Sequence, residues 1–253
     1  MRPVSTSEKL RLDDLLVRRG LFESRSRARD AILRGTVAVD GVAATKAGRA
    51  VADQAAITVD DPARAYVSRA ALKLAHGLEH FGQAPAGRLA LDIGASTGGF
   101  TQVLLERGGA HVIAIDVGHD QMRPELASDP RVTSLEGVNA RDLTREHLGG
   151  RAPEIVVSDV SFVSLRLALP PALELAASGA FGIFLVKPQF EAGREMIGKG
   201  GLLTDPSLGE RIAANMAQWL DAQLGWRALG ITLSPIEGGD GNREFLLGGV
   251  KDR

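Results

Sequence analysis

The chain has 253 residues, of which 44% are hydrophobic and 24% are charged, and its formal net charge is −1. It contains no cysteine, which excludes disulfides, thiolate metal sites and cysteine nucleophiles and is compatible with a cytoplasmic protein. No apolar run approaches the roughly 20 residues that cross a bilayer, and the N-terminal stretch lacks the apolar core of a signal peptide. We therefore expect a globular protein without a membrane partner, built as one large domain or as a large and a small one.

Positive charge is concentrated in the first fifth of the chain. Residues 1–50 carry eleven basic and six acidic side chains, a balance of +5. A single arginine on a helix is usually just solvated. Six of them lie close together and are opposed only by Glu23 and Asp30, so we expect phosphate contact from Arg18, Arg19, Arg25, Arg27, Arg29 and Arg34. The charge pattern predicts a small N-terminal module that faces nucleic acid.

The elements of this module can be taken in chain order. Leucines at 10, 12, 15 and 16 predict a short amphipathic helix that ends at Gly20. Ser24 is placed to cap a second helix, Arg25 to Leu33, which Gly35 stops. Residues 36–42 predict a hairpin around Asp40-Gly41, and residues 56–59 a further strand. The module is therefore expected to be a small α+β domain.

Residues 9–60 resemble the small RNA-binding module named after ribosomal protein S-four. The resemblance rests on Arg11-Leu12-Asp13-Asp14-Leu15-Leu16, on Ser24-Arg25-Ser26-Arg27-Ala28-Arg29, and on the stretches Ile32–Gly35 and Val37–Gly41. It implies docking on structured RNA, and it adds Arg11 to the candidate RNA-binding residues.

Pro62 marks a domain boundary, because the strand pattern ends there. We expect an RNA-binding domain over residues 1–63, a linker over 64–67 and a second domain over 68–253. Ser68 is placed to cap a helix that runs to about Phe81. Its polar positions share one face, which is either a solvated surface or part of a site: Arg69, Lys73, His76 and His80.

From Arg88 onward strands alternate with helices, which predicts a Rossmann-like, doubly wound α/β sheet of seven mostly parallel strands. The expected strands are 89–93, 111–117, 132–136, 154–159, 182–187, 228–233 and 244–249. The expected helices are 100–107, 164–177 and 206–224, the middle one interrupted by Pro170 and Pro171. The last two strands are joined by too short a connection for a crossover, so the final strand should be antiparallel.

A glycine-rich turn joins the first strand of this sheet to its helix, an arrangement that receives nucleotide-like ligands. It lacks the lysine of a P-loop and the dinucleotide glycine spacing. Asp116 ends the next strand, where an acid accepts hydrogen bonds from ribose. Glycine-rich turns are common in α/β folds. The combination of this turn with Asp116 fits S-adenosylmethionine, which has a ribose but no phosphate. The candidate cofactor-binding residues are Asp92, Gly94, Ala95, Ser96, Thr97, Gly98, Gly99, Phe100, Asp116, Val117, Asn139 and Asp159.

Charged residues stand at three further strand ends of the same rim. Asp159 and Lys187 end parallel strands, Glu244 begins the antiparallel one, and the preceding helix can add Lys73. Any one pair could be a surface salt bridge, but their convergence beside a cofactor turn favours a site. We expect Lys187 to deprotonate a ribose 2′-hydroxyl or stabilise its oxyanion, with the other three holding it and the ribose during attack on a sulfonium methyl. This transfer needs no metal, and we predict no metal site.

Lys73, Asp159, Lys187 and Glu244 resemble the Lys-Asp-Lys-Glu tetrad of the FtsJ-like ribose 2′-O-methyltransferases. With the N-terminal module and Arg64-Ala65-Tyr66-Val67, nearly the whole chain resembles the TlyA family, often labelled hemolysin A. The resemblance implies a cytoplasmic enzyme that methylates cytidine 2′-hydroxyls of ribosomal RNA in ribosomal subunits. At Asn139 FtsJ-like enzymes often carry an acid. The alternatives are a non-catalytic RNA-binding or ribosome assembly factor and a membrane-acting hemolysin. Neither the target subunit nor the oligomeric state follows from the sequence.

Overall fold

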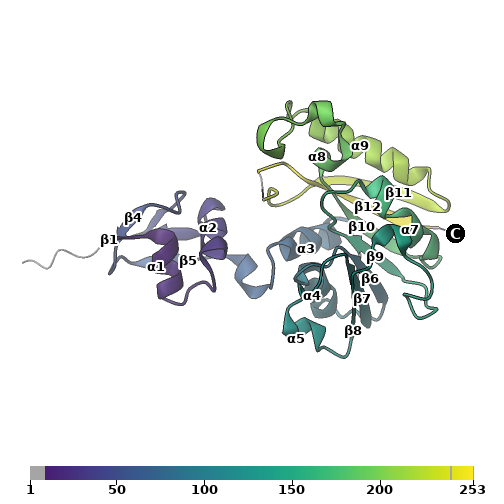
Figure 1. The fold of residues 1–253 in the computed structure, drawn as a ribbon, viewed down its shortest axis with the longest axis horizontal. Helices are drawn as coiled ribbons and strands as arrows, with labels where there is room; N and C mark the ends of the chain where they lie inside the picture. Colours follow the sequence, from purple (N-terminus) through teal and green to yellow (C-terminus); the bar gives the residue numbers. More distant parts are fainter. Residues whose placement is uncertain (1–8, 240, 253) are drawn as a thin grey trace, which may run out of the picture. The chain divides into compact units, whose positions relative to one another are not determined.

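The computed structural model describes residues 9–239 and 241–252, which form two compact units that divide between Ala65 and Tyr66 (Figure 1). This division falls within the stretch 64–67 that the sequence indicates as a linker. The N-terminal unit ends in a short 3-10 helix, η1 (Pro62–Ala65). Each unit has its own hydrophobic core.

The N-terminal unit packs two helices beside short strands. Helix α1 (Leu12–Arg18) lies against α2 (Arg25–Leu33), and the hydroxyl of Ser24 caps α2 by accepting a hydrogen bond from the N–H of Arg27 at 3.3 Å. Strand β2 (Val37–Val39) is the centre of a three-stranded antiparallel sheet with β3 (Val42–Ala43) and β5 (Ile57–Val59). Each of these elements matches an expected one.

The prediction that Leu10 belongs to the first helix is wrong. Leu10 lies in strand β1 (Lys9–Arg11), which pairs antiparallel with β4 (Ala50–Ala52), so that Leu10 faces Val51. Helix α1 begins only at Leu12. The leucine spacing fits a helix equally well, and the pairing partner lies some 40 residues along the chain, so local periodicity could not identify this strand.

The larger unit is built on one seven-stranded sheet. Its strands are β6 (Leu89–Ile93), β7 (His111–Asp116), β8 (Val132–Glu136), β9 (Ile155–Ser158), β10 (Phe181–Val186), β11 (Trp226–Leu233) and β12 (Phe245–Lys251). They lie in the order β11-β12-β10-β9-β6-β7-β8, and β12 alone runs opposite to the other six. The predicted fold class, a mostly parallel methyltransferase-type sheet with an antiparallel last strand, is confirmed.

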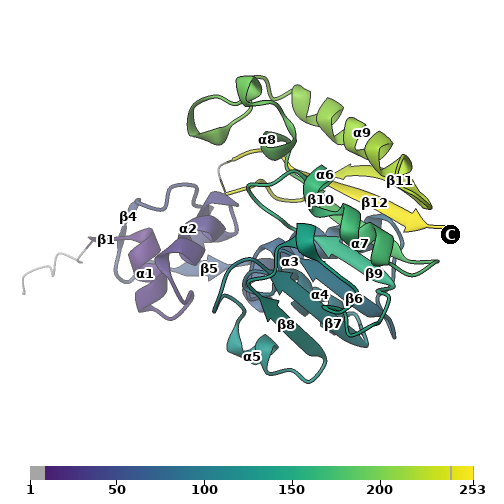
Figure 2. The same ribbon diagram turned by 45° about the vertical axis from the view of Figure 1, so that its right-hand side comes forward.

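Helices cover both faces of this sheet (Figure 2). One core joins the sheet to α3 (Ala70–His80), α4 (Gly99–Glu106) and α5 (Pro124–Ala127). The other joins its opposite face to α6 (Leu165–Ala168), α7 (Pro170–Leu175) and α9 (Leu208–Asp221). The expected interruption at Pro170 is present, because α6 and α7 are separate. Short helical segments complete the unit: η2 (Ala140–Asp142), α8 (Pro188–Glu191), η3 (Arg194–Met196) and η4 (Lys199–Gly201).

The strand register brings the candidate residues to one rim. Ile93 of β6 lies beside Ser158 of β9, and Val186 at the end of β10 lies beside Phe245 at the start of β12. The carboxyl ends of three parallel strands and the amino end of the antiparallel one therefore share an edge. At this edge, Asp159 directly follows β9, Lys187 directly follows β10, and Glu244 directly precedes β12.

Candidate active site

Two glycines shape the turn between β6 and α4. Gly94 and Gly98 have φ angles of 78° and 96°, in the left-handed region where a side chain is strained. A Cβ atom on Gly94 would lie 3.0 Å from the carbonyl oxygen of Asp159, and one on Gly98 would lie 2.4 Å from Leu126 Cδ1. The left-handed φ angle and the lack of space for a Cβ atom both require glycine at these two positions. The N–H groups of Gly94, Ala95, Ser96 and Gly98 donate within the fold and hold the turn in place. The unpaired donors next to the turn are those of the amino end of α4.

A cavity of about 160 Å³ lies beside this turn. Seven of the twelve candidate cofactor-binding residues line it: Gly94, Ala95, Ser96, Thr97, Gly99, Phe100 and Asp159. Ser68, Ala70, Ser161 and Lys187 complete the wall. The structure thus places most of the glycine turn around a single space.

The remaining candidates lie outside that wall. Asp116 accepts hydrogen bonds from the N–H of Ser96 at 2.8 Å and from the N–H of Gly118 at 2.7 Å, so it holds the glycine turn from behind. Asn139 accepts from the N–H of Arg141 at 3.1 Å and caps η2, and Val117 is exposed. Gly98 acts through the shape of the turn.

Asp92, the fifth of these, is fully buried in the sheet. The hydroxyl of Thr101 donates to its Oδ2 at 2.7 Å, whereas its Oδ1 has no hydrogen-bond partner among the described residues. Burial raises the pKa of this carboxyl to about 7, and the negative charges of Asp159 and Asp116 act in the same direction. Asp92 therefore supports the turn from within the core.

A second cavity, of about 220 Å³, contains all four residues of the predicted tetrad. Its wall is formed by Ser68, Arg69, Ala70, Lys73, Asp159, Ser161, Phe162, Lys187, Gln189, Phe190, Gly239 and Glu244. Five residues belong to both cavities: Ser68, Ala70, Asp159, Ser161 and Lys187. The two spaces therefore adjoin where Asp159 and Lys187 lie.

The tetrad forms two ion pairs shielded from solvent. Lys73 Nζ lies 2.5 Å from Glu244 Oε2, with side chains that are 6% and 3% exposed. Lys187 Nζ lies 2.7 Å from Asp159 Oδ1, with side chains that are 10% and 16% exposed. These are not the solvated surface pairs that the sequence left as an alternative. Breaking such a pair leaves a charge without compensation, so each lysine is held by its acid.

Among the cavity residues that the sequence did not single out as site residues, three stand out: Ser161, Phe162 and Phe190. Ser161 Oγ accepts a hydrogen bond from Lys187 Nζ at 2.6 Å. Phe162 is 91% exposed with a left-handed φ of 64°, and its ring centroid lies 5.3 Å from that of Phe190. The exposed ring of Phe162 and its left-handed backbone are both unfavourable for stability. Their combination points to a functional role for this residue. For Ser161 and Phe162 the signal available in the sequence was their place directly after Asp159, and for Phe190 its place shortly after Lys187.

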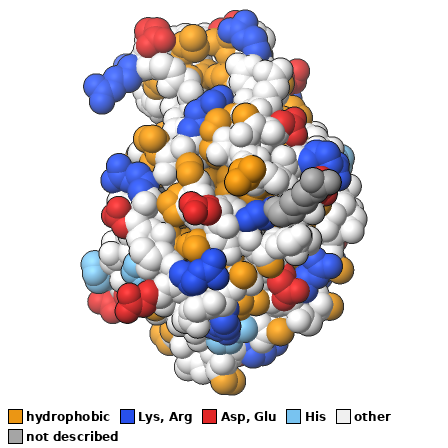
Figure 3. All heavy atoms as spheres, turned by 90° about the vertical axis from the view of Figure 1, so that its right-hand side faces the viewer, with side chains coloured by type: hydrophobic (Ala, Val, Ile, Leu, Met, Phe, Trp, Pro, Cys, Tyr) orange, Lys and Arg blue, Asp and Glu red, His pale blue; other side chains and the backbone are white. Residues whose placement is uncertain are grey.

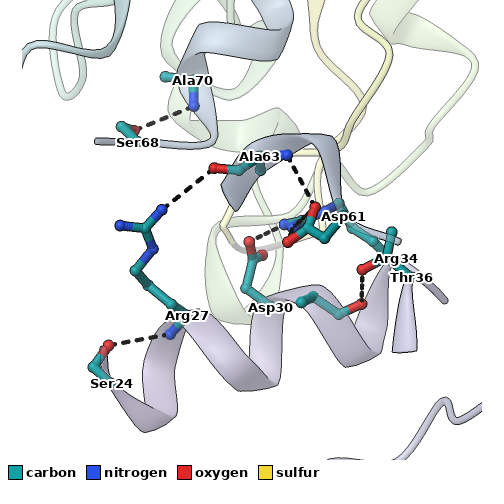
Figure 4. A network of polar contacts seen from close by, with 10 residues as sticks. Ser24, Arg27, Asp30, Arg34, Thr36, Asp61, Ala63, Ser68 and Ala70 are labelled. Atoms are coloured by element: carbon teal, nitrogen blue, oxygen red, sulfur yellow. Dashed lines mark hydrogen bonds and ion pairs between the residues drawn. The ribbon is translucent and has the colours of Figure 1, made fainter. Parts of the chain in front are cut away.

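Two candidate RNA-binding arginines serve the structure of the N-terminal unit. Arg34 is 14% exposed and forms ion pairs with Asp30 and Asp61, the latter at 2.8 Å (Figure 4). Arg19 donates to the backbone carbonyls of Asp53 and Ala55. Their guanidinium groups join α1 and α2 to the segments that follow β4 and β5.

Of the other candidate arginines, Arg11, Arg18, Arg25 and Arg29 are exposed and Arg27 is half-buried. Arg11 and Arg25 each lie 3.0 Å from Oδ2 of the buried Asp13, and hydrogen bonding from Arg11, reinforced by Arg25, lowers the pKa of Asp13 to about 2. Arg27 pairs with Glu23 and donates to the carbonyl of Ala63 (Figure 4). Arg18 and Arg29 are exposed, and no side-chain partner for them appears among the described residues.

The described part of the chain contains no helix that is both long and apolar enough to cross a membrane. On the face drawn in Figure 3, basic and acidic side chains are interspersed. The face shows no single field of one charge, in keeping with the formal net charge of −1.

Comparisons with known proteins match both units. The family model of the FtsJ-like methyltransferases matches residues 66–251, and that of the S4 domain matches residues 10–56. The 16S/23S rRNA (cytidine-2′-O)-methyltransferase TlyA of Mycobacterium tuberculosis is 48% identical over 95% of this chain and 90% of its own. Hemolysin A of Brachyspira hyodysenteriae is 41% identical over 94% of this chain and 98% of its own.

The solved structures agree with this relationship. A candidate hemolysin from Streptococcus thermophilus superposes with a TM-score of 0.74 and 37% identity, over 97% of this chain and 90% of its own. The likeness thus extends over both units of the chain. The chain belongs to the FtsJ-like methyltransferases and, within them, to the TlyA family that carries an N-terminal S4 domain.

Proposed function

We propose that this protein transfers a methyl group from S-adenosylmethionine to the 2′-hydroxyl of a cytidine in ribosomal RNA. The observation that carries the proposal is the junction of the two cavities at Asp159 and Lys187. One cavity is walled by a glycine turn that suits a nucleoside, and the other by two buried lysine–acid pairs. The substrate class follows from the relative in Mycobacterium tuberculosis, whose name specifies cytidine 2′-O-methylation of ribosomal RNA.

The residues around the first cavity fit S-adenosylmethionine. Asp159 lines this cavity with a side chain that is 16% exposed, and its carboxylate can accept a hydrogen bond from a donor on a ligand. Gly94 and Gly99 place no side chain in this cavity, and the turn has no lysine for a phosphate. The ligand itself supplies an electrophilic methyl group on a positively charged sulfur.

Lys187 is placed to act on the acceptor hydroxyl. As a neutral amine it takes the 2′-hydroxyl proton while that oxygen forms its bond to the methyl carbon and the carbon–sulfur bond breaks. The ammonium formed in this way is stabilised by Asp159, whose Oδ1 lies 2.7 Å away. The proton thus ends on Lys187 and is released to solvent after the transfer.

Lys73 and Glu244 act on the ribose from the same wall. Their 2.5 Å ion pair fixes both side chains in the second cavity, and Lys73 Nζ retains N–H groups for ribose oxygens. Because the ion pair is already rigid, the ribose is oriented when it binds and not during the reaction. This positioning lowers the activation free energy of methyl transfer. Phe162 adds an exposed ring at this cavity that offers a stacking surface for a base.

The N-terminal unit would deliver the RNA. Its S4 match and its exposed arginines support docking on ribosomal RNA within a subunit. Arg18, Arg29, Arg11 and Arg25 have guanidinium groups that reach solvent, and they are therefore better placed for phosphates than Arg19 and Arg34.

The test uses the whole protein with methyl-labelled S-adenosylmethionine and purified small and large ribosomal subunits, followed by nuclease mapping of the label. We expect label on a cytidine ribose. Lys187→Ala should bind the donor and lose at least ~100-fold in rate, as expected for removal of a general base. The exposed Lys199, which lines neither cavity, provides the control variant Lys199→Ala.

Other outcomes would identify the competing functions. Label on a base would contradict the mechanism assigned to Lys187. Binding to ribosomal RNA with no transfer to either subunit would favour a non-catalytic assembly factor. Lysis of protein-free liposomes by the purified chain would favour the hemolysin activity named for the Brachyspira relative.

A further inference from the structure

Lys187 has two partners, and they differ in kind. Asp159 Oδ1 lies 2.7 Å from Lys187 Nζ and forms an ion pair with it, but the contact is not aligned as a hydrogen bond. Ser161 Oγ accepts a true hydrogen bond from the same nitrogen at 2.6 Å. Both partners act on the lysine N–H groups, and Ser161 is the one that accepts an aligned hydrogen bond from Lys187.

The position of Ser161 is set by its own loop and not by Lys187. The N–H of Asp159 donates to the carbonyl of Ile93 at 3.0 Å, which holds the start of the loop on β6. At its end, Glu191 accepts from the Ser164 hydroxyl at 2.5 Å and from the Leu165 N–H at 2.7 Å. The hydroxyl of Ser161 is thus presented from a backbone segment anchored at both ends.

Ser161 also lies where chemistry would occur. It belongs to the walls of both cavities, together with Asp159 and Lys187. Its side chain is solvent-accessible, unlike the buried pair of Lys73 and Glu244. A residue needed only for the fold has no reason to stand at this junction.

We infer that Ser161 is a positioning residue for methyl transfer, which directs the lone pair of Lys187 toward the acceptor hydroxyl. This inference rests on the proposed function. A neutral primary amine has two N–H bonds and one lone pair. When one N–H is held by Ser161 and the other is attracted by Asp159, the lone pair faces the third side. Without the hydroxyl, the amine rotates about its last C–N bond and its lone pair is aimed correctly for only part of the time.

The kinetic test compares Ser161→Ala, Ser161→Thr and the control Ser178→Ala, an exposed serine that lines neither cavity. We expect kcat of Ser161→Ala to fall about tenfold, near the upper end of what the loss of one hydrogen bond between uncharged groups causes. KM for RNA and Kd for the donor should stay within twofold, and Ser161→Thr should recover most of the rate. A structural role would instead raise KM and lower stability, and threonine would not rescue it.

A double variant tests whether Ser161 acts through Lys187. In a Lys187→Ala background, Ser161→Ala should reduce the residual rate by less than twofold, because its target is absent. Losses that multiply would overturn the inference. So would a kcat of Ser161→Ala within twofold of the unsubstituted protein.

A chemical measurement separates this inference from the proposed function. Trace acetylation with acetic anhydride, without RNA or donor, reports the reactivity of Lys187 relative to exposed Lys199 in the same molecule. We expect Ser161→Ala to change that ratio at least threefold and Ser161→Thr to restore it, whereas an unchanged ratio would refute the positioning role. If the unsubstituted protein methylates no ribose, the proposed function fails, and the labelling ratio still decides whether Ser161 orients Lys187.

Discussion

The buried carboxyl of Asp92 makes the stability of the larger unit dependent on pH. Its pKa rises from an ordinary 3.8 to about 7, because burial penalises the charged form. Between these values the folded protein holds a proton that the unfolded chain has released. The free energy of unfolding must therefore fall as pH rises through this window.

The size of the effect follows from the shift. About three pKa units correspond to ~4 kcal/mol at ~1.4 kcal/mol per unit. With these two pKa values, about half of that loss, ~2 kcal/mol, falls between pH 5.5 and pH 8.5. Asp92→Asn has no proton to release, so it should lose ~2 kcal/mol less than the unsubstituted protein over the same interval.

Urea unfolding followed by tryptophan fluorescence measures this difference. Both tryptophans, Trp219 and Trp226, lie in the larger unit, so the signal reports that unit. Asp205→Asn is the matched control, because that exposed carboxyl has a lowered pKa and stays ionised throughout. An Asp92→Asn variant whose pH dependence matches that of the unsubstituted protein within ~0.5 kcal/mol would refute the reasoning.

Three further predictions follow from the geometry. Gly98→Ala should lower the free energy of unfolding by ~1–3 kcal/mol and weaken donor binding in calorimetry, because its Cβ has no room and its φ is left-handed. Glu244→Gln should cost ~3–5 kcal/mol in urea unfolding by leaving Lys73 unpaired, and the double variant with Lys73→Met should lose less than the sum. Arg34→Ala should reduce hydrogen-exchange protection of residues 9–65, whereas Arg29→Ala should preserve it and lower the salt slope of RNA binding by about 1.

Several features were predictable because their causes are local. The glycine turn after Ile93 and the break at Pro170 follow from the steric limits of single residues. The hydrophobic strands follow from side chains that must be buried on both faces of a parallel sheet. The order of the strands then places Asp159, Lys187 and Glu244 at one rim, because parallel strands end on the same side.

Other features depend on partners far along the chain. Lys73 and Glu244 are separated by 171 positions, and nothing near either residue indicates a 2.5 Å buried pair. The leucine at position 10 pairs with a strand that local periodicity does not show. Ser161 looked like an ordinary loop serine until the backbone brought it to Lys187.

The arginines of the N-terminal unit show the division between the two kinds of information. The sequence by itself determined that positive charge gathers there, since composition requires no coordinates. Only the tertiary structure decided that Arg34 forms an ion pair with Asp61 while Arg29 remains exposed. The physical reason is that the energy of a charge depends on its distance to partners and on its burial, and folding sets both.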